Sequence, residues 1–147
     1  MLFSHDRNQL RRFYVESWRK ARQGLALEPL ERLVAEVVAE HPEYHALLES
    51  EERALGREFL PEHGETNPFM HMGLHIAIRE QVASNRPQGI AALYRRFCKA
   101  LGSKMDAEHL MMDALAESLW LAQRQGTPPD EAAYLAQLKQ MLQRLGR

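Results

Sequence analysis

Two histidines of this chain, His71 and His75, are four residues apart in a segment that carries the signals of a helix start. Asn67 has a side chain preferred at an N-cap, and Pro68 fits the first helical position. At about 100° per residue, the helix carries both histidines on its apolar stripe, which consists of His71, Leu74, His75, Ile78 and Val82. Imidazole is a common ligand of transition metals, and a buried polar group without a partner costs roughly 1–3 kcal/mol. The spacing therefore predicts that the pair binds either a metal ion or other polar side chains.

A second group of polar residues follows the expected end of an earlier helix. Pro42 can start a short helix, which we expect to run to about residue 52. This helix would place His45 and Glu49 on one face, and His41 directly precedes it. The segment thus offers two imidazoles and a carboxylate to a site inside the fold.

A third group lies on a long helix expected from Asp106 to about residue 125. His109, Asp113 and Trp120 lie within about 60° of one another on this helix, and Glu117 flanks them. The helix is apolar nearly all round, which is typical of a central helix. We therefore expect His109 and Asp113 to be buried and Trp120 to anchor the core.

Together the three segments can supply the ligands of a divalent transition metal such as zinc, nickel or iron. The four expected ligands are histidines, with His45 as an alternative third ligand or as the fourth: His71, His75, His109 and His45. Three carboxylates are expected as further ligands or as hydrogen-bond partners of the imidazoles: Glu49, Asp113 and Glu117. Three protein ligands and a water would leave an open position suited to hydrolytic or transferase chemistry.

The same residues fit a second interpretation without metal. Buried histidines and carboxylates can form a hydrogen-bond network that sets the register of packed helices. The protein would then be a non-enzymatic interaction module that presents a helical surface to another protein. Both interpretations stay open at the level of the sequence, and the metal content of the purified protein distinguishes them.

Several enzyme classes do not fit the chain. Met72 stands where the zinc peptidase motif His-Glu-x-x-His has its glutamate. Di-iron proteins need Glu-x-x-His on two helices, whereas Glu108 and His109 are adjacent. Phosphate-binding glycine loops, G-x-S-x-G elbows and dinucleotide fingerprints are also missing from the sequence. These observations argue against peptidases, di-iron oxygenases, P-loop enzymes, serine hydrolases and Rossmann dehydrogenases.

Charge and composition narrow the expected partners and compartment. The net charge of −1 creates no strong field for nucleic acid or an anionic membrane. The single cysteine, Cys98, allows no intrachain disulfide, and the chain shows neither a signal peptide nor an apolar stretch of roughly 20 residues. We therefore expect a cytoplasmic protein whose partner is another protein or a small molecule, and the sequence leaves a homodimer open.

The pattern of apolar residues and helix breakers predicts an all-α fold. Apolar residues recur at helical spacing in segments that end at Gly, Pro or Asn, and alternation typical of strands is missing. We expect a single-domain helical bundle of residues 1–147 with about six or seven helices. The expected helices span approximately 6–22, 29–41, 42–52, 67–83, 90–101, 106–125 and 130–145.

Four blocks of the sequence resemble a small proteobacterial family, domain of unknown function 1841. These blocks read HPEYHALLE (41–49), TNPFMHMGLH (66–75), DAEH (106–109) and QGTPP (125–129). The resemblance covers nearly the whole chain and implies a stand-alone cytoplasmic protein without an assigned activity. The recurring blocks of the family include the positions that are occupied here by His45, His71, His75 and His109.

The histidines are also similar, more loosely, to those of the DinB-like bundles. Those bundles hold a divalent ion with three histidines, two of them four residues apart on one helix. By this analogy His71 and His75 would form the pair, and His45 or His109 would be the third ligand.

Overall fold

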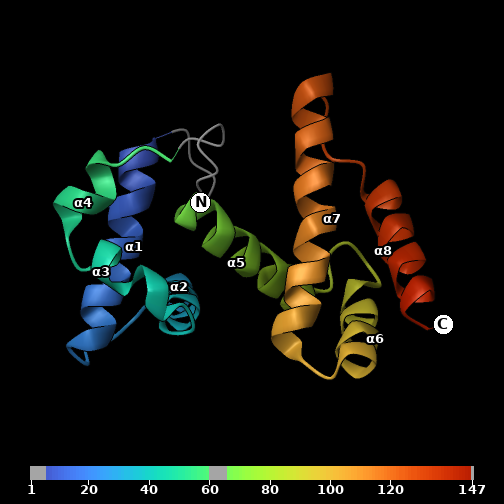
Figure 1. Cartoon of the computed structure of the whole chain (residues 1–147), viewed down its shortest axis with the longest axis horizontal. Coiled ribbons are helices and arrows are strands. Elements are labelled where there is room, and N and C mark those ends of the chain that lie inside the picture. Colours follow the sequence, from blue (N-terminus) through green and yellow to red (C-terminus); the bar gives the residue numbers. More distant parts are fainter. Residues whose placement is uncertain (1–5, 60–65, 147) are drawn as a thin grey trace. The chain divides into compact units, whose positions relative to one another are not determined.

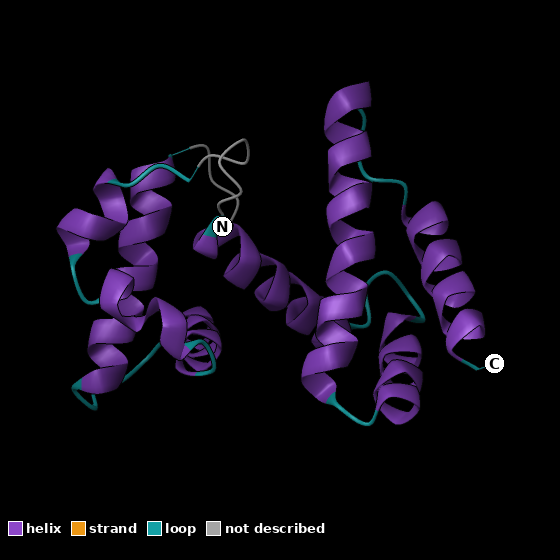
Figure 2. Ribbon diagram, viewed as in Figure 1, coloured by secondary structure: helices purple, strands orange, loops and turns teal. Residues whose placement is uncertain are grey.

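The computed structural model describes residues 6–59 and 66–146, and every regular element in these ranges is a helix (Figures 1 and 2). In chain order the elements are α1 (Arg7–Arg22), α2 (Pro29–Ala39), the 3-10 helix η1 (Pro42–Tyr44), α3 (His45–Leu48), α4 (Glu51–Gly56), α5 (Pro68–Ser84), α6 (Ile90–Leu101), α7 (Lys104–Gln125) and α8 (Glu131–Leu145). The predicted all-α class is confirmed. His63 and most of the connection expected between α4 and α5 lie outside the described residues.

The chain divides into two compact units, Met1–Ile76 and Ala77–Arg147, and the boundary falls within α5. The first unit contains α1 to α4 and the start of α5, and the second contains the end of α5 and α6 to α8. The expectation that residues 1–147 form one domain stays a prediction.

Side chains at the helix ends explain where most of the helices begin and stop. The carboxylate of Asp6 accepts a hydrogen bond from the Gln9 amide at the start of α1. The side-chain oxygen of Asn67 accepts from the amides of Phe69 and Met70 at the start of α5. At the end of α6, Gly102 has a φ of 69°, a left-handed conformation in which glycine is not strained. The helix starts expected at about residues 6 and 67 are confirmed.

The segment after Pro42 differs from the single short helix that we expected. It forms η1, α3 and α4, and the break between α3 and α4 falls at Ser50. Ser50 has an extended backbone, and its hydroxyl accepts a hydrogen bond from the Arg53 amide at 3.3 Å. A serine that caps a new helix competes with continuation of the previous one, which is the physical reason for the break. As a result, α3 ends at Leu48, before Glu49.

The apolar core of the first unit holds together α1, α2, α3, α4 and the start of α5. Its fully or nearly fully buried members are Tyr14, Val34, Val37, Val38, Leu48, Ala54, Phe69, Met72 and Ile76. Trp18 packs against this core. This core fixes the start of α5 and the end of α2 within the first unit. It thereby positions His41, His71 and His75.

A buried arginine links α1 to the end of α4. The Arg11 side chain is only 2% exposed, and its Nη1 donates hydrogen bonds to the backbone carbonyls of Ala54 (2.8 Å) and Arg57 (2.6 Å). Its guanidinium carbon lies 4.8 Å from the centre of the Phe69 ring. Burial lowers the pKa of Arg11, but the carbonyls and the aromatic face still accommodate the charge.

We expect Arg11→Met to lower the free energy of unfolding by roughly 2–3 kcal/mol, because two carbonyls lose a charged donor. Urea denaturation measures this change. Arg12→Met is the matched control, because Arg12 is exposed and pairs with the exposed Glu51, and such pairs contribute little. Equal losses in the two variants would contradict the assigned role of Arg11.

The second unit is built from α6, α7 and α8 together with the last turns of α5. The Tyr134 hydroxyl donates a hydrogen bond to the Gln81 side-chain oxygen at 2.8 Å, which joins α8 to α5 within this unit. The prediction that Trp120 anchors the core is wrong. The Trp120 side chain is 53% exposed, and the Arg124 guanidinium covers its ring at 4.7 Å.

None of the helices in residues 6–59 and 66–146 combines the length and the apolar character that a membrane span requires.

Candidate metal centre

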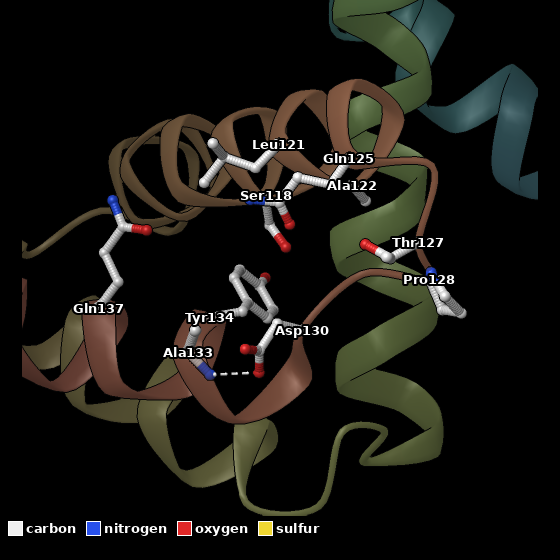
Figure 3. A pocket seen from close by; sticks show the side chains of 10 residues that line it. All are labelled: Ser118, Leu121, Ala122, Gln125, Thr127, Pro128, Asp130, Ala133, Tyr134 and Gln137. Carbon is white, nitrogen blue, oxygen red and sulfur yellow. Dashed lines mark hydrogen bonds between the residues drawn. The ribbon is translucent and has the colours of Figure 1, made fainter.

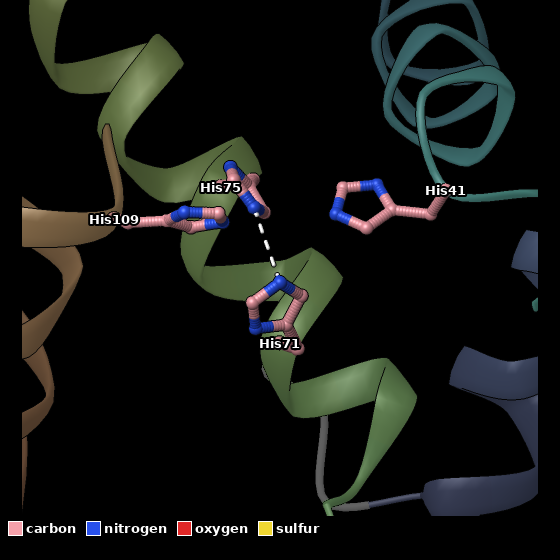
Figure 4. A group of neighbouring side chains, drawn as sticks. All are labelled: His41, His71, His75 and His109. Atoms are coloured by element: carbon pink, nitrogen blue, oxygen red, sulfur yellow. Dashed lines mark hydrogen bonds between the residues drawn. The ribbon is translucent and has the colours of Figure 1, made fainter. Parts of the chain in front are cut away.

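His71 and His75 face each other on α5, as the sequence predicted. Their Nε2 atoms are 3.3 Å apart, and the two ring centres are 4.8 Å apart (Figure 4). His75 is fully buried and His71 is half-buried. The expectation that the two imidazoles share one face of the helix is confirmed.

The distance between the two Nε2 atoms fits a shared ligand. Nitrogens bound to one tetrahedral zinc at 2.0–2.1 Å are about 3.3 Å apart by simple geometry. The same separation suits a hydrogen bond in which one imidazole donates to the other. The pair can therefore hold a metal ion or a shared proton.

His41 is the third histidine of this group, and we did not include it among the expected ligands. It follows α2 and is 4% exposed, and its ring centre lies 4.8 Å from that of His75 and 5.2 Å from that of His71 (Figure 4). One ligand nitrogen from each of these three histidines lies within 4.8 Å of the others. The first unit therefore brings together three imidazoles from two distant segments of the chain.

A hydrogen bond to the backbone determines the tautomer of His41. Its Nδ1 is 2.7 Å from the Val37 carbonyl oxygen, and because a carbonyl only accepts, Nδ1 must carry the proton. In neutral His41 the lone pair is therefore on Nε2. Histidines that bind metals typically donate their other ring N–H in this way, which fixes the tautomer and the orientation of the ring.

Tyr44 forms an aromatic wall beside these histidines. Its ring stacks on His41, with centres 5.6 Å apart and planes at 3°, and it contacts His71 edge-on at 6.3 Å. Burial, assisted by the nearby charge of Glu43, raises the pKa of Tyr44. The phenol therefore stays protonated at neutral pH and adds no negative charge to the group.

His45, an expected ligand, lies in a different environment. Its Nε2 donates a hydrogen bond to the Val38 carbonyl at 2.7 Å, and its ring packs on Trp18 with centres 4.5 Å apart. It is not part of the histidine group that could hold a metal. The contacts of His45 are those of a residue that fastens η1 and α3 to α1 and α2.

The three carboxylates that we expected near the imidazoles are exposed. Glu49 caps the end of α3, and Glu117 on α7 accepts a hydrogen bond from the Gln137 side chain at 2.8 Å. Asp113 is exposed on α7. Within residues 6–59 and 66–146, no carboxylate belongs to the group formed by His41, His71 and His75.

His109 lies on α7 in the second unit, and its side chain is exposed. The predictions that His109 and Asp113 are buried are therefore wrong. The buried side of α7 instead carries Ala107, Glu108, Met111, Met112, Ala114, Leu115 and Ala122. Because α7 is apolar on most of its circumference, its sequence does not specify which side packs inward.

Glu108, the neighbour of His109, forms a buried ion pair with the end of α5. Its carboxylate is 5% exposed and accepts two hydrogen bonds from the Arg79 guanidinium, at 2.8 and 3.1 Å. Arg79 comes one turn after His75 on α5. Within the second unit, this pair fixes the first half of α7 to the end of α5.

A separate pocket of about 170 Å³ lies between α7 and α8 in the second unit (Figure 3). Two of the polar groups on its wall have roles in the fold. Asp130 accepts from the Ala133 amide, and the hydroxyl of Tyr134, whose pKa burial raises, donates to Gln81. We assign this pocket no function.

Comparison with known proteins identifies a family without adding an activity. Nothing among curated proteins matches the chain, and nothing among solved structures does. Residues 6–140 match the family described as a domain of unknown function, DUF1841. The histidine segments between His41 and His109 all fall inside the matched range. The chain therefore belongs to the DUF1841 family.

Proposed function

We propose that this protein binds one divalent transition metal ion through His41, His71 and His75 of the first unit. The observation that carries the proposal is the 3.3 Å separation of the His71 and His75 Nε2 atoms, with a third imidazole beside them. Burial adds support, because His75 is fully buried and His41 is 4% exposed, so bulk water is largely kept away from an ion bound to these rings.

The types of donor atom favour particular metals. Imidazole suits zinc, nickel, copper and iron, whereas magnesium, calcium and manganese prefer oxygen ligands. The group contains neither thiolate nor carboxylate among the described residues. Mononuclear iron sites commonly add a carboxylate to two histidines, so this donor set favours zinc or nickel over iron.

The alternative is the metal-free network of an interaction module. Two observations favour it: the 3.3 Å separation also suits a hydrogen bond between His71 and His75, and Trp120 offers an exposed aromatic surface to a partner. In this case the imidazoles set the packing of α2 on α5 and take up no ion.

The metal content of the protein separates the two functions. We expect untagged protein, purified without chelators, to contain close to one zinc or nickel ion per chain by inductively coupled plasma mass spectrometry. Protein that contains no metal and takes up none on dialysis against zinc or nickel would contradict the proposal and leave the metal-free network.

A further inference from the structure

The charge of the histidine group has a consequence for what else binds there. Neutral imidazoles contribute no negative charge, so a divalent ion held by His41, His71 and His75 keeps both of its positive charges. Most metal sites with zinc-like ions offset part of this charge with thiolates, carboxylates or a bound hydroxide.

Among residues 6–59 and 66–146, no carboxylate or thiolate belongs to the histidine group, so the group itself does not compensate this charge. His75 is fully buried and His41 is 4% exposed, so bulk water screens an ion at their nitrogens only weakly. Glu40 and Glu43, which flank His41 in the sequence, are exposed, and water screens their charges. Tyr44 packs on two of the rings as a neutral phenol. An isolated charge in such surroundings is costly unless a counter-charge binds to it.

We propose that the metal-loaded group takes a small anion, either hydroxide or a compact inorganic anion or carboxylate, as an exchangeable ligand beside the histidines. This inference rests on the proposed metal binding. With three histidines bound, the anion takes the fourth position of a tetrahedral ion. His71, which is half-buried, marks the side from which the anion can enter.

Cobalt(II) and azide are the probes for the test, because the visible absorption of cobalt(II) reports its ligands. The full-length protein is stripped with chelator, loaded with one equivalent of cobalt(II) and titrated with azide, with perchlorate at equal ionic strength as control. We expect a saturable change in the visible bands with azide only, while the cobalt that remains bound after desalting stays at one per chain. The His45→Ala variant should behave in the same way, because His45 lies outside the histidine group.

The possible results distinguish a failure of the anion site from a failure of metal binding itself. Failure to retain cobalt, zinc or nickel would overturn both proposals. Retained cobalt with a spectrum that azide does not change would overturn the anion site alone, because the histidines would then fill the coordination sphere. Loss of cobalt on addition of azide would also overturn the anion site. Azide would then remove the metal from the histidines instead of binding to it beside them.

Discussion

Replacing His71 by alanine is expected to abolish zinc binding in practice, with a loss of affinity on the order of a hundredfold or more. The reason is geometric: the His71 Nε2 is one of two nitrogens that are 3.3 Å apart, and without it His75 and His41 form an incomplete site. Competition with a chromophoric chelator measures the affinity. Urea denaturation with and without zinc gives a second measure, because bound metal stabilises only the protein that binds it.

His45→Ala is the matched control for this variant. Both histidines are half-buried in the first unit, but His45 donates to the Val38 carbonyl and packs on Trp18. We expect this control to lose about 1–3 kcal/mol of stability while it keeps zinc binding. If the stability difference between wild type and His71→Ala is the same with and without zinc, the metal proposal is wrong and the metal-free network remains.

The second large effect is expected for Arg79→Ala, which removes both hydrogen bonds to the buried Glu108 carboxylate. Breaking a buried ion pair by deleting one partner commonly costs 3–5 kcal/mol, because the remaining charge keeps its desolvation cost. Because Arg79 is 20% exposed, we expect a loss near the lower end, about 3 kcal/mol. Urea denaturation followed by circular dichroism measures it.

The exposed pair between Arg19 and Glu16 on α1 provides the comparison. Its side chains are 39% and 48% exposed, and water screens their charges. Arg19→Ala should therefore leave the denaturation midpoint nearly unchanged. A loss in Arg79→Ala no larger than that in Arg19→Ala would show that the buried pair contributes little to stability.

The sequence by itself determined the local features of this protein. Helix starts could be predicted at Asp6 and Asn67, because an N-cap depends on a side chain and the amides two or three residues after it. The pairing of His71 with His75 could be predicted for the same reason, since residues four apart in one helix are always neighbours. Signals confined to one turn do not depend on the rest of the fold.

Only the tertiary structure decided which distant residues join this pair. His41 and His45 are four residues apart in the same segment, yet His41 contacts the rings of His71 and His75 while His45 packs on Trp18. The choice depends on where α2 ends, which is at Ala39, two residues before His41. Nothing within one helical turn encodes that placement, because it follows from the packing of the whole apolar core.

The orientation of α7 was likewise decided by packing. Its sequence is apolar on most sides, so the choice between burying His109 and burying its neighbour Glu108 depends on which face meets the other helices. Glu108 is buried because Arg79, 29 residues earlier in the chain, neutralises its charge. A charged residue is buried only with a partner, and periodicity within one helix does not reveal a partner on another.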